Sequence, residues 1–554
     1  MSATLARQVE RLRRQAAEVA TRLSGDARSS VTVAMERATL RMVGVDGLDR
    51  SGRPLAGSTV ERFCGADPDR LAGGILLPFA VAGAAHNLAP RELALEVAAG
   101  SIDLVAEAEA AGAEARAAAE KRAAALLNAA LARFDANRTA ARVQREILGS
   151  PHEPWLGLAL QADGAREAAG EVRRLVARGV DVVQVTVPAS WEYAEAQRAA
   201  TSGPGVNAAD LQRGTRTRAE RAGRAVRRLA RPSLPQLPRP GESMPAGSQR
   251  GLAELRRTAD QAAAERGSYA SLMTVASAFA APEQAVVAAF ERIDFVEADP
   301  IREIVELNVD PDRALADHAF AHRLQARAGC GVVMGAGPLT LGAEMASGVP
   351  SDPATRAGQT LALQAVGVEL ALAGGLPADR LLLGAVPGWI GGGSRSLTYL
   401  VQAWLRRAAF PQYRLVIEMP RPESASGRPR AGWTAPLVAA LAGAPASLVV
   451  VEPGARAAES GAADLAAAAA AAAALRATLG DGELHGDARE MALKTVAAAL
   501  EVLKRLKGDG WASVLGPAGA EMAGEPFGRA AVVRRSNEPT SEGGVLDRLL
   551  RAPA

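Results

Sequence analysis

Short apolar runs alternate with longer, helix-patterned segments through the middle of the chain. Residues 293–296 form one such run, which ends at turn residues 297–300, and residues 331–334 form another, which ends at a Gly-rich turn. Between them, residues 312–327 place apolar side chains at helical spacing among charged ones. Two short runs joined by a helix are typical of a strand, helix, strand unit in a parallel sheet.

The same unit recurs along the chain and indicates the fold class. The eight strand candidates are residues 155–160, 181–187, 270–275, 292–296, 331–334, 380–383, 413–417 and 447–451. Eight alternations predict an α/β fold, a (β/α)8 TIM barrel, whose functional site gathers at the carboxyl ends of the strands. We call that end the barrel mouth. A doubly wound open sheet is the competing architecture, and the absence of G-x-G-x-x-G after the first strand weakens it.

The flanks of the predicted barrel have helical patterns. Residues 1–24 predict an amphipathic helix, residues 30–150 are mostly helical with clear segments at 31–43 and 90–100, and residues 107–142 suit one long solvent-facing helix. Helices are also expected at 460–478 and 487–507, before an extended or flexible tail from Gly508. The predicted organisation is therefore a helical region at 1–150, the barrel at 151–460, and C-terminal helices and tail at 461–554.

An insertion interrupts the predicted barrel at residues 196–250. It is rich first in Arg and then in Pro, and a solvated helix followed by a partly disordered Pro-rich loop accounts for it better than a site for an anionic partner.

Composition limits the class of protein. Apolar residues make up 48% of the chain and charged residues 23%, with a net charge of +3, so nothing points to a nucleic-acid partner. Cys64 and Cys330 show neither metal spacing nor a disulfide framework, which favours a reduced, cytoplasmic setting. The amino terminus lacks a signal-peptide core, and no apolar run suits a membrane span.

Carboxylates follow several of the predicted strands. A cluster able to bind an amine or do acid–base work is formed by Glu297, Asp299, Glu418 and Glu452. The alternative is that each carboxylate pairs with a loop arginine such as Arg302, Arg313 or Arg421, and the sequence leaves both interpretations open.

A Gly-rich loop follows the sixth predicted strand. It contains Gly392, Gly393, Ser394 and Arg395 and precedes a helix, so its backbone amides suit a phosphate. A flexible turn without a ligand is the stronger interpretation, since three glycines are a weak signal.

Two further residue types carry information about chemistry. His318 and His322 have the i, i+4 spacing of metal ligands, but no third ligand is evident, so a structural role is favoured and no metal is predicted. Residues 122–493 contain no lysine, so a pyridoxal enzyme built on this barrel must take its Schiff-base lysine from another polypeptide.

Several blocks, in order along the chain, resemble one known family. They are TVAMERATLRMVGVDG at 32–47, NRT at 137–139, GVDVV at 179–183, APE at 281–283, FERID at 290–294, RALADH at 313–318 and LALAGGLP at 370–377. Together the chain resembles the α subunit family of lysine 5,6-aminomutase over roughly residues 10 to 510.

The resemblance implies a particular chemistry. The family's barrel subunit holds pyridoxal phosphate and a small amino-acid substrate, while a smaller, cobalamin-binding β subunit brings adenosylcobalamin and the coenzyme lysine. The reaction is a radical 1,2-shift of an amino group. The missing barrel lysine and the absence of D-x-H-x-x-G from this chain are consistent with a hetero-oligomer that includes such a partner.

The chain departs from the family at several ligand positions. An arginine that grips the coenzyme phosphate is replaced by Val187 or Pro188, an Asn-Tyr pair by Thr274-Val275, and a substrate-contacting aspartate by Asn308. The remaining polar candidates are Ser190, Ser277, Asp299 and Arg313.

The resulting hypotheses come from different classes. The first is an isomerase, the barrel subunit of an aminomutase acting on a lysine-like substrate, with substrate contacts at Glu297, Asp299, Asn308, Arg313 and Glu418 and cofactor contacts at Ser190, Thr274, Ser277 and residues 392–395. The alternatives are a non-catalytic homologue that scaffolds or regulates a partner, and a barrel that binds a different phosphate-bearing ligand.

Overall fold

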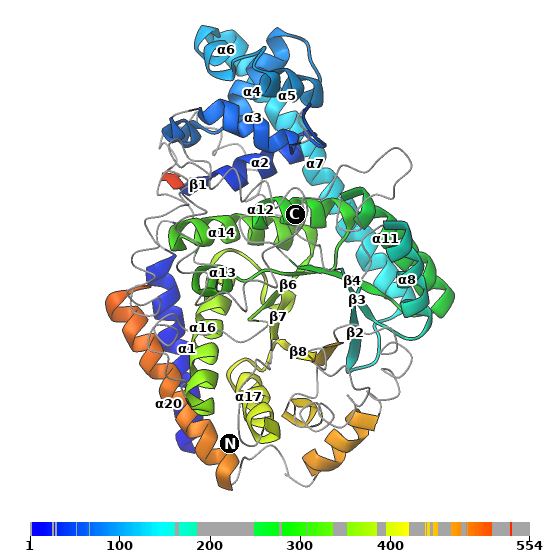
Figure 1. Cartoon of the computed structure of the whole chain (residues 1–554), viewed down its shortest axis with the longest axis vertical. Helices are drawn as coiled ribbons and strands as arrows, with labels where there is room; N and C mark the ends of the chain where they lie inside the picture. Colours follow the sequence, from blue (N-terminus) through cyan, green and yellow to red (C-terminus); the bar gives the residue numbers. More distant parts are fainter. Residues whose placement is uncertain are drawn as a thin grey trace, which may run out of the picture.

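The fold is a closed barrel of eight parallel strands in a layer of helices (Figure 1). The computed structural model describes residues 3–24, 27, 30–50, 53–65, 67–160, 165–185, 249–275, 280–306, 309–335, 352–384, 395–419, 438, 440–443, 447–451, 467–477, 484, 486–511 and 532–534. The strands are β2 (Trp155–Leu160), β3 (Val182–Val185), β4 (Ser271–Val275), β5 (Phe295–Glu297), β6 (Gly331–Met334), β7 (Leu381–Gly384), β8 (Arg414–Met419) and β9 (Ser447–Val451). Each pairs in parallel with its neighbours, and β9 closes on β2, so the predicted TIM barrel is confirmed.

Alternation along the strands separates an inner from an outer core. The barrel centre is filled by Val182, Met273, Val333, Leu382, Val416 and Leu448, with Trp155 and Phe295 packed against them. The intervening strand residues, such as Leu272 and Val332, belong to the larger core shared with the surrounding helices. A strand buried on both faces reads as a continuous apolar run, which explains why short runs identified the strands.

Local capping sets the bounds of the helices in the outer layer. Helix α14 (Pro311–Ala328) begins where Asp310 accepts a hydrogen bond from the Arg313 backbone amide, and it ends at Gly329, whose φ of 70° suits glycine. The other described helices of this layer are α8 (Ala165–Ala177), α11 (Gln249–Arg266), α12 (Ala281–Glu291), α13 (Pro300–Glu306), α16 (Pro353–Ala373) and α17 (Arg395–Ala409).

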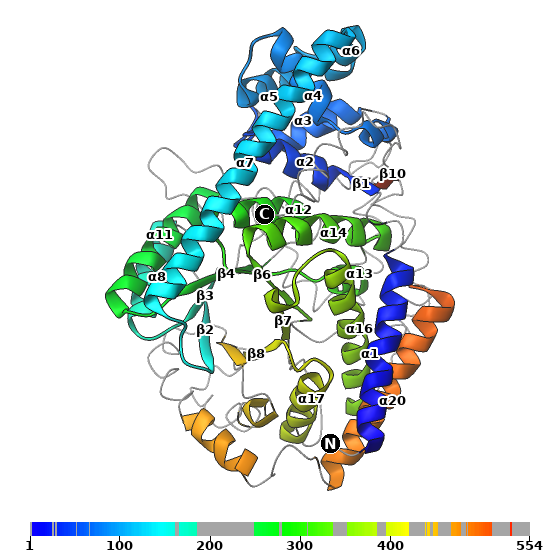
Figure 2. The ribbon, with the colours of Figure 1, turned by 180° about the vertical axis from the view of Figure 1, so that it is seen from behind.

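The two ends of the chain pack together on the barrel. Helix α1 (Ala3–Leu23) and helix α20 (Gly486–Asp509) lie side by side against α16 (Figures 1 and 2). The apolar stripe of α1, which includes Leu5, Leu12 and Val19, is fully buried there. The predicted amphipathic helix is confirmed, and the helix predicted at 487–507 is extended by one residue at its start and two at its end.

A second hydrophobic core lies above the barrel in Figure 1, where residues of α12 and α14, such as Val286 and Phe320, pack against helices that precede the barrel. These are α2 (Val33–Met42), α3 (Leu55–Cys64), α4 (Leu76–Ala85), α5 (Pro90–Ala99), α6 (Leu104–Ala110) and α7 (Ala113–Leu148), with the short 3-10 helix η2 (Pro68–Gly73). The single long helix expected at 107–142 was wrong in its bounds. The chain turns at Ala111 and Gly112, and α7 then runs on to Leu148.

The expected helix at 31–43 also needs a correction. Residues Ser30–Thr32 form a strand, β1, that pairs antiparallel with β10 (Val532–Arg534) from the tail. Helix α2 begins after it because the Thr32 side chain accepts a hydrogen bond from the Met35 amide and caps the helix. The predicted helix at 460–478 is described over residues 467–477.

A buried carboxylate ties the amino-terminal end of the barrel together. Asp294, at the start of β5, accepts hydrogen bonds from Arg256 at 2.9 Å, from the Tyr269 hydroxyl at 2.7 Å and from Arg145 of α7 at 2.5 Å. It also accepts from the Leu272 backbone amide at 2.9 Å. One side chain therefore joins α7, α11 and two strands.

None of the helices in the described ranges is both long and apolar enough to cross a bilayer.

Candidate functional site

The barrel mouth contains an inward-facing layer of polar groups. Gln184 of β3 and Glu297 of β5 each lie two residues beyond a residue of the inner core, Val182 and Phe295 respectively. Alternation therefore directs both side chains inward, and each is less than a tenth exposed. Gln184 was not among the sequence candidates. Its signal was a single polar residue inside the apolar run 182–185, at the inward position.

Glu297 is held by an arginine from the helix that follows it. The Arg302 guanidinium donates to Glu297 Oε1 at 2.6 Å, and 42% of the Arg302 side chain is exposed. The pairing of a strand-end carboxylate with a loop arginine, one of the two interpretations of the sequence, is present here. Because Arg302 reaches solvent, it can return to water when another cation takes its place at the buried Glu297 carboxylate.

Asp299 fixes the backbone around Glu297. One of its carboxylate oxygens accepts from the Ile301 amide and the other from the Gly335 amide, both at 2.8 Å. It therefore caps α13 and joins the ends of β5 and β6. Burial raises the pKa of Asp299, while these backbone hydrogen bonds act against the rise. Both oxygens are engaged by the backbone, which makes Asp299 a positioning residue.

An arginine lies under the carboxyl end of β7. Arg406 of α17 is 1% exposed and donates to the Gly384 carbonyl at 2.9 Å and to Gln364 Oε1 at 2.7 Å. Gln364 in turn donates to the carbonyls of Met334 and Gly384, so the ends of β6 and β7 are joined. Burial lowers the pKa of Arg406 to about 10, and its Nη2 atom has no hydrogen-bond partner among the described residues. A buried cation therefore lies beside a strand end with one donor atom to spare.

Two sequence candidates lie away from the mouth. Thr274 is in register with Val185 and Val296, which belong to the core shared with the helices, so its side chain faces that layer. Arg313 lies in the first turn of α14, 3.6 Å from Asp317, which bonds to Thr32 at the start of α2. Burial raises the pKa of Asp317 to about 6, and Arg313 and Thr32 act against the rise.

The remaining candidates are only partly described. The described residues exclude Asn308, Ser190, Ser277, Gly392, Gly393 and Ser394, as well as Val187 and Pro188. Glu418 lies in β8, in register with Val450, and Arg395 begins α17, but the side chains of both are outside the described set.

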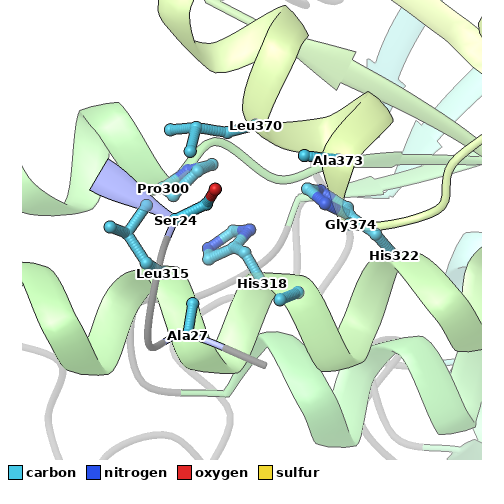
Figure 3. Close-up of a pocket in the computed structure, with 10 residues that line it drawn as sticks. Ser24, Ala27, Pro300, Leu315, His318, His322, Leu370, Ala373 and Gly374 are labelled. Carbon is cyan, nitrogen blue, oxygen red and sulfur yellow. The ribbon is translucent and has the colours of Figure 1, made fainter. Parts of the chain in front are cut away.

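The histidine pair lines a small cavity in the helix layer (Figure 3). His318 and His322 are 1% exposed, with ring centroids 5.7 Å apart, and the cavity between α14, the end of α16 and Ser24 measures about 20 Å³. That volume holds one water molecule. Among the described residues, no three His, Cys, Asp or Glu side chains are arranged so that they could hold a metal ion.

The two rings have different electrostatic surroundings. Burial acts against the charged form of His318, but Glu303, 3.1 Å from its Nε2 atom, and the carboxylates of Asp299 and Asp317 together raise its pKa. Burial and the neighbouring His318 lower the pKa of His322 to about 3, and neither of its ring nitrogens has a hydrogen-bond partner in the described part of the chain. His322 is therefore a neutral ring of the packed interior.

Comparison with known proteins decides the family. Residues 4–191 and 246–427 match the family described as "D-Lysine 5,6-aminomutase TIM-barrel domain of alpha subunit". The chain belongs to this family. It is 24% identical over 410 residues to the lysine 5,6-aminomutase alpha subunit of Fusobacterium nucleatum subsp. nucleatum. The aligned region covers 72% of this chain and 68% of that protein.

Membership of the aminomutase barrel family is consistent with the geometry. The match skips residues 192–245, which lie mostly within the insertion predicted from Arg and Pro content. The match includes the strands that carry Gln184, Glu297 and Gly384, so the polar groups of the mouth lie on the family's own barrel.

Proposed function

We propose that this chain is the barrel subunit of an adenosylcobalamin-dependent aminomutase, which moves an amino group between adjacent carbons of a lysine-like amino acid. The observation that carries the proposal is the family match across the barrel together with the absence of lysine from it. A cobalamin-binding partner subunit completes the site, and the enzyme is cytoplasmic.

The position of the four lysines supports the need for a partner. Lys121 lies on α7, and Lys494, Lys504 and Lys507 lie on α20, all at exposed positions. Helix α20 packs against α1 and α16 on the outside of the barrel (Figure 1). A lysine that holds pyridoxal phosphate at the mouth therefore comes from another chain.

The described residues suit an amino-acid substrate and an anionic coenzyme. Pyridoxal phosphate, when bound, supplies an electron-withdrawing ring beside the migrating amino group, and adenosylcobalamin supplies the radical. Glu297 accepts hydrogen bonds from a substrate ammonium group, and Gln184 orients it through its amide. Arg406, with its unpartnered Nη2 atom, is the described cation that would hold an anionic group at the end of β7. Asp299 keeps the β5 end in place by its backbone hydrogen bonds.

The test is reconstitution with a candidate partner. This chain is co-expressed with a protein that carries D-x-H-x-x-G and a suitable lysine, and the purified complex is mixed with both coenzymes. We expect a pyridoxal absorbance band near the visible edge and conversion of a lysine isomer into a product with a shifted amino group. A colourless complex with no conversion contradicts the proposal.

A second candidate function rests on the departures at the strand ends. Val275 is inward-facing at the end of β4, where the family resemblance implies a tyrosine over the coenzyme ring. An apolar residue there favours a homologue that binds its partner without the reaction. A complex that forms tightly but leaves the pyridoxal spectrum unchanged from free coenzyme supports this scaffold, and a shifted spectrum supports the enzyme.

A further inference from the structure

A cleft opens at the amino-terminal end of the barrel, opposite the mouth. It measures about 600 Å³ and lies between the last turns of α7, the end of α14 and the short helix η4 (Ala378–Arg380). Three of its lining residues lie shortly before strands: Ser150 comes before β2, Gly329 before β6, and Arg380 before β7. It is therefore separate from the site proposed for the aminomutase reaction.

Arginine dominates the polar lining of this cleft. Four guanidinium groups line it, from Arg138, Arg142, Arg145 and Arg380, together with Ser150 and with Thr139, whose hydroxyl donates to the Asp135 carbonyl at 2.9 Å. The one carboxylate of the described lining is Glu146, whose side chain is 64% exposed and lies 3.9 Å from Arg142. A ligand rich in acceptor oxygens complements such a surface.

Three of the four guanidinium groups are available to a ligand. Arg145 is committed to the buried Asp294 at 2.5 Å. Arg142 and Arg380 make only long ion pairs within the described ranges, 3.9 Å to Glu146 and 3.6 Å to Asp379, with carboxylates that are 64% and 75% exposed. Exposed pairs of this kind contribute little to stability, so a stronger anion replaces them readily.

Glycine brings two of these arginines to one place. A Cβ atom on Gly329 would lie 3.0 Å from Arg138 Cγ and 3.9 Å from Arg380 Nη2, so both side chains pass directly over this residue. The Arg138 side chain makes no ion pair or hydrogen bond within the part of the chain that the structure describes. Helix α7 adds Arg142 one turn further on, on the same face.

The balance of charge favours an anion. The carboxyl ends of α7 and α14 contribute partial negative charges of about half a unit each, which three guanidinium groups outweigh. The volume falls within the range of about 300–1,000 Å³ that is typical of small-molecule pockets, whereas a peptide requires a longer, flatter surface.

We propose that this cleft binds a small molecule that carries two or more phosphate groups, such as a nucleoside di- or triphosphate or pyrophosphate. Planar guanidinium groups bind phosphate oxygens in pairs, which the positions of Arg138, Arg142 and Arg380 around one concave volume allow. The inference goes beyond the proposed function and does not depend on it, because none of these residues lies at the barrel mouth.

The test is binding of defined probes to the full-length chain, or to its complex with the partner if the chain requires one. Pyrophosphate, ATP and a polyglutamate peptide are titrated by calorimetry at one ionic strength. We expect pyrophosphate and ATP to bind and the peptide not to bind. Equal affinity for pyrophosphate and ATP would show that the cleft binds the phosphate groups alone. Tighter binding of ATP would show that it also contacts the nucleoside.

Variants locate the site. Arg138→Gln with Arg142→Gln should weaken phosphate binding by about tenfold or more. The matched control is Arg91→Gln, which removes another exposed arginine with a long ion pair, 3.7 Å to Asp46, far from the cleft in sequence. All three side chains lie at the surface, and circular dichroism checks that the variants fold.

Three results would overturn the proposal: no binding of either phosphate probe, binding that the double variant leaves unchanged, or preference for the peptide. Phosphate bound at the barrel mouth is insensitive to the double variant, so a failure here is distinct from a failure of the aminomutase proposal.

Discussion

Glu297 is the described side chain whose removal should affect substrate most directly. Glu297→Gln removes the negative charge that faces the barrel mouth but keeps the shape of the side chain. Because hydrogen bonds to charged groups contribute about 1.5–3 kcal/mol, we expect KM for the amino-acid substrate to rise about tenfold to a hundredfold. Steady-state kinetics of the reconstituted complex measure the change.

Its control removes a comparable ion pair elsewhere. Glu265→Gln breaks the pair with Arg173 at 2.7 Å on the outer surface of the barrel, where both side chains are more than half exposed. KM should not change in this control. An unaltered KM in Glu297→Gln as well would place the ammonium site elsewhere.

Asp294 should be important for stability alone. Asp294→Ala removes the carboxylate partner of the Tyr269 hydroxyl and leaves the buried Arg256 guanidinium with only its ion pair to Asp260. Removal of one partner from a buried pair costs about 3–5 kcal/mol, which we expect as the loss of unfolding free energy in urea. Glu490→Gln, which breaks an exposed pair with Lys494 on α20, should leave the free energy of unfolding nearly unchanged. Equal losses would show that the Asp294 cluster is not buried in solution.

His322 should make stability depend on pH in a known direction. Its ordinary pKa of 6.5 in the unfolded chain is lowered to about 3 in the folded protein, so the unfolded state binds more protons between these values. The stabilising contribution is present above pH 6.5 and is lost as the pH falls. Relative to His322→Leu, the parent should therefore lose about 1.4 kcal/mol per pH unit over the acidic part of this range.

The difference between the parent and His322→Leu isolates the contribution of the His322 ring to the pH dependence of stability. Glu303, Asp299, Asp317 and His318 face the same region from α13, the β5 end and α14, and all four are present in both proteins, so their contributions largely cancel in the difference. Urea unfolding at several pH values gives the two curves. Parallel curves would mean that His322 is accessible to protons in the folded state.

Among the elements, the close contact of α16 with α20 requires glycine at position 358, because there is no room for a side chain there. A Cβ atom at Gly358 would clash with the Thr495 carbonyl and would lie 2.7 Å from Ala498 Cβ and 2.9 Å from the Ala499 amide. Gly358→Val should force the helices apart and cost about 1–3 kcal/mol or more, measured as a lower melting temperature.

A second helical glycine provides the control with the opposite sign. A Cβ atom on Gly170 of α8 would meet no described atom within 4 Å, so Gly170→Ala should stabilise by about 0.5–1 kcal/mol through helix propensity. If Gly358→Val were as stable as the parent, the two helices would not be in close contact.

The elements themselves could be predicted largely from pattern. Trp155–Leu160, Gly331–Met334 and Ser447–Val451 match their predicted bounds, because strands buried on both faces are continuous apolar runs between turns. The β1–β10 pair could not be predicted, since its two strands lie about 500 residues apart in sequence and neither has its own periodicity.

The site was less predictable, for a physical reason. Glu297 and Asp299 follow a strand, and barrel topology alone places them near the mouth. Whether a side chain faces inward depends on strand parity, which separates Glu297 and Gln184 from Thr274. The role of Arg406 depends on the packing of α17 and α16 against the strands, and no local pattern in the sequence contains that information.

For the whole molecule, the distribution of lysine makes the most decisive prediction. Every lysine lies on α7 or α20, on the outer surface, whereas the barrel from β2 to β9 contains none. Borohydride fixes pyridoxal phosphate on whichever lysine holds it. After reduction of the reconstituted complex, mass spectrometry should find the pyridoxyl group on a lysine of the partner and none in stoichiometric amount on this chain. The barrel subunit alone should remain unlabelled at the same coenzyme concentration, because its four lysines lie exposed on α7 and α20 and not at the barrel strands. Stoichiometric labelling of Lys494, Lys504 or Lys507 in an active complex would require α20 to leave its position against α16, and the division of labour proposed between the two subunits would then be wrong.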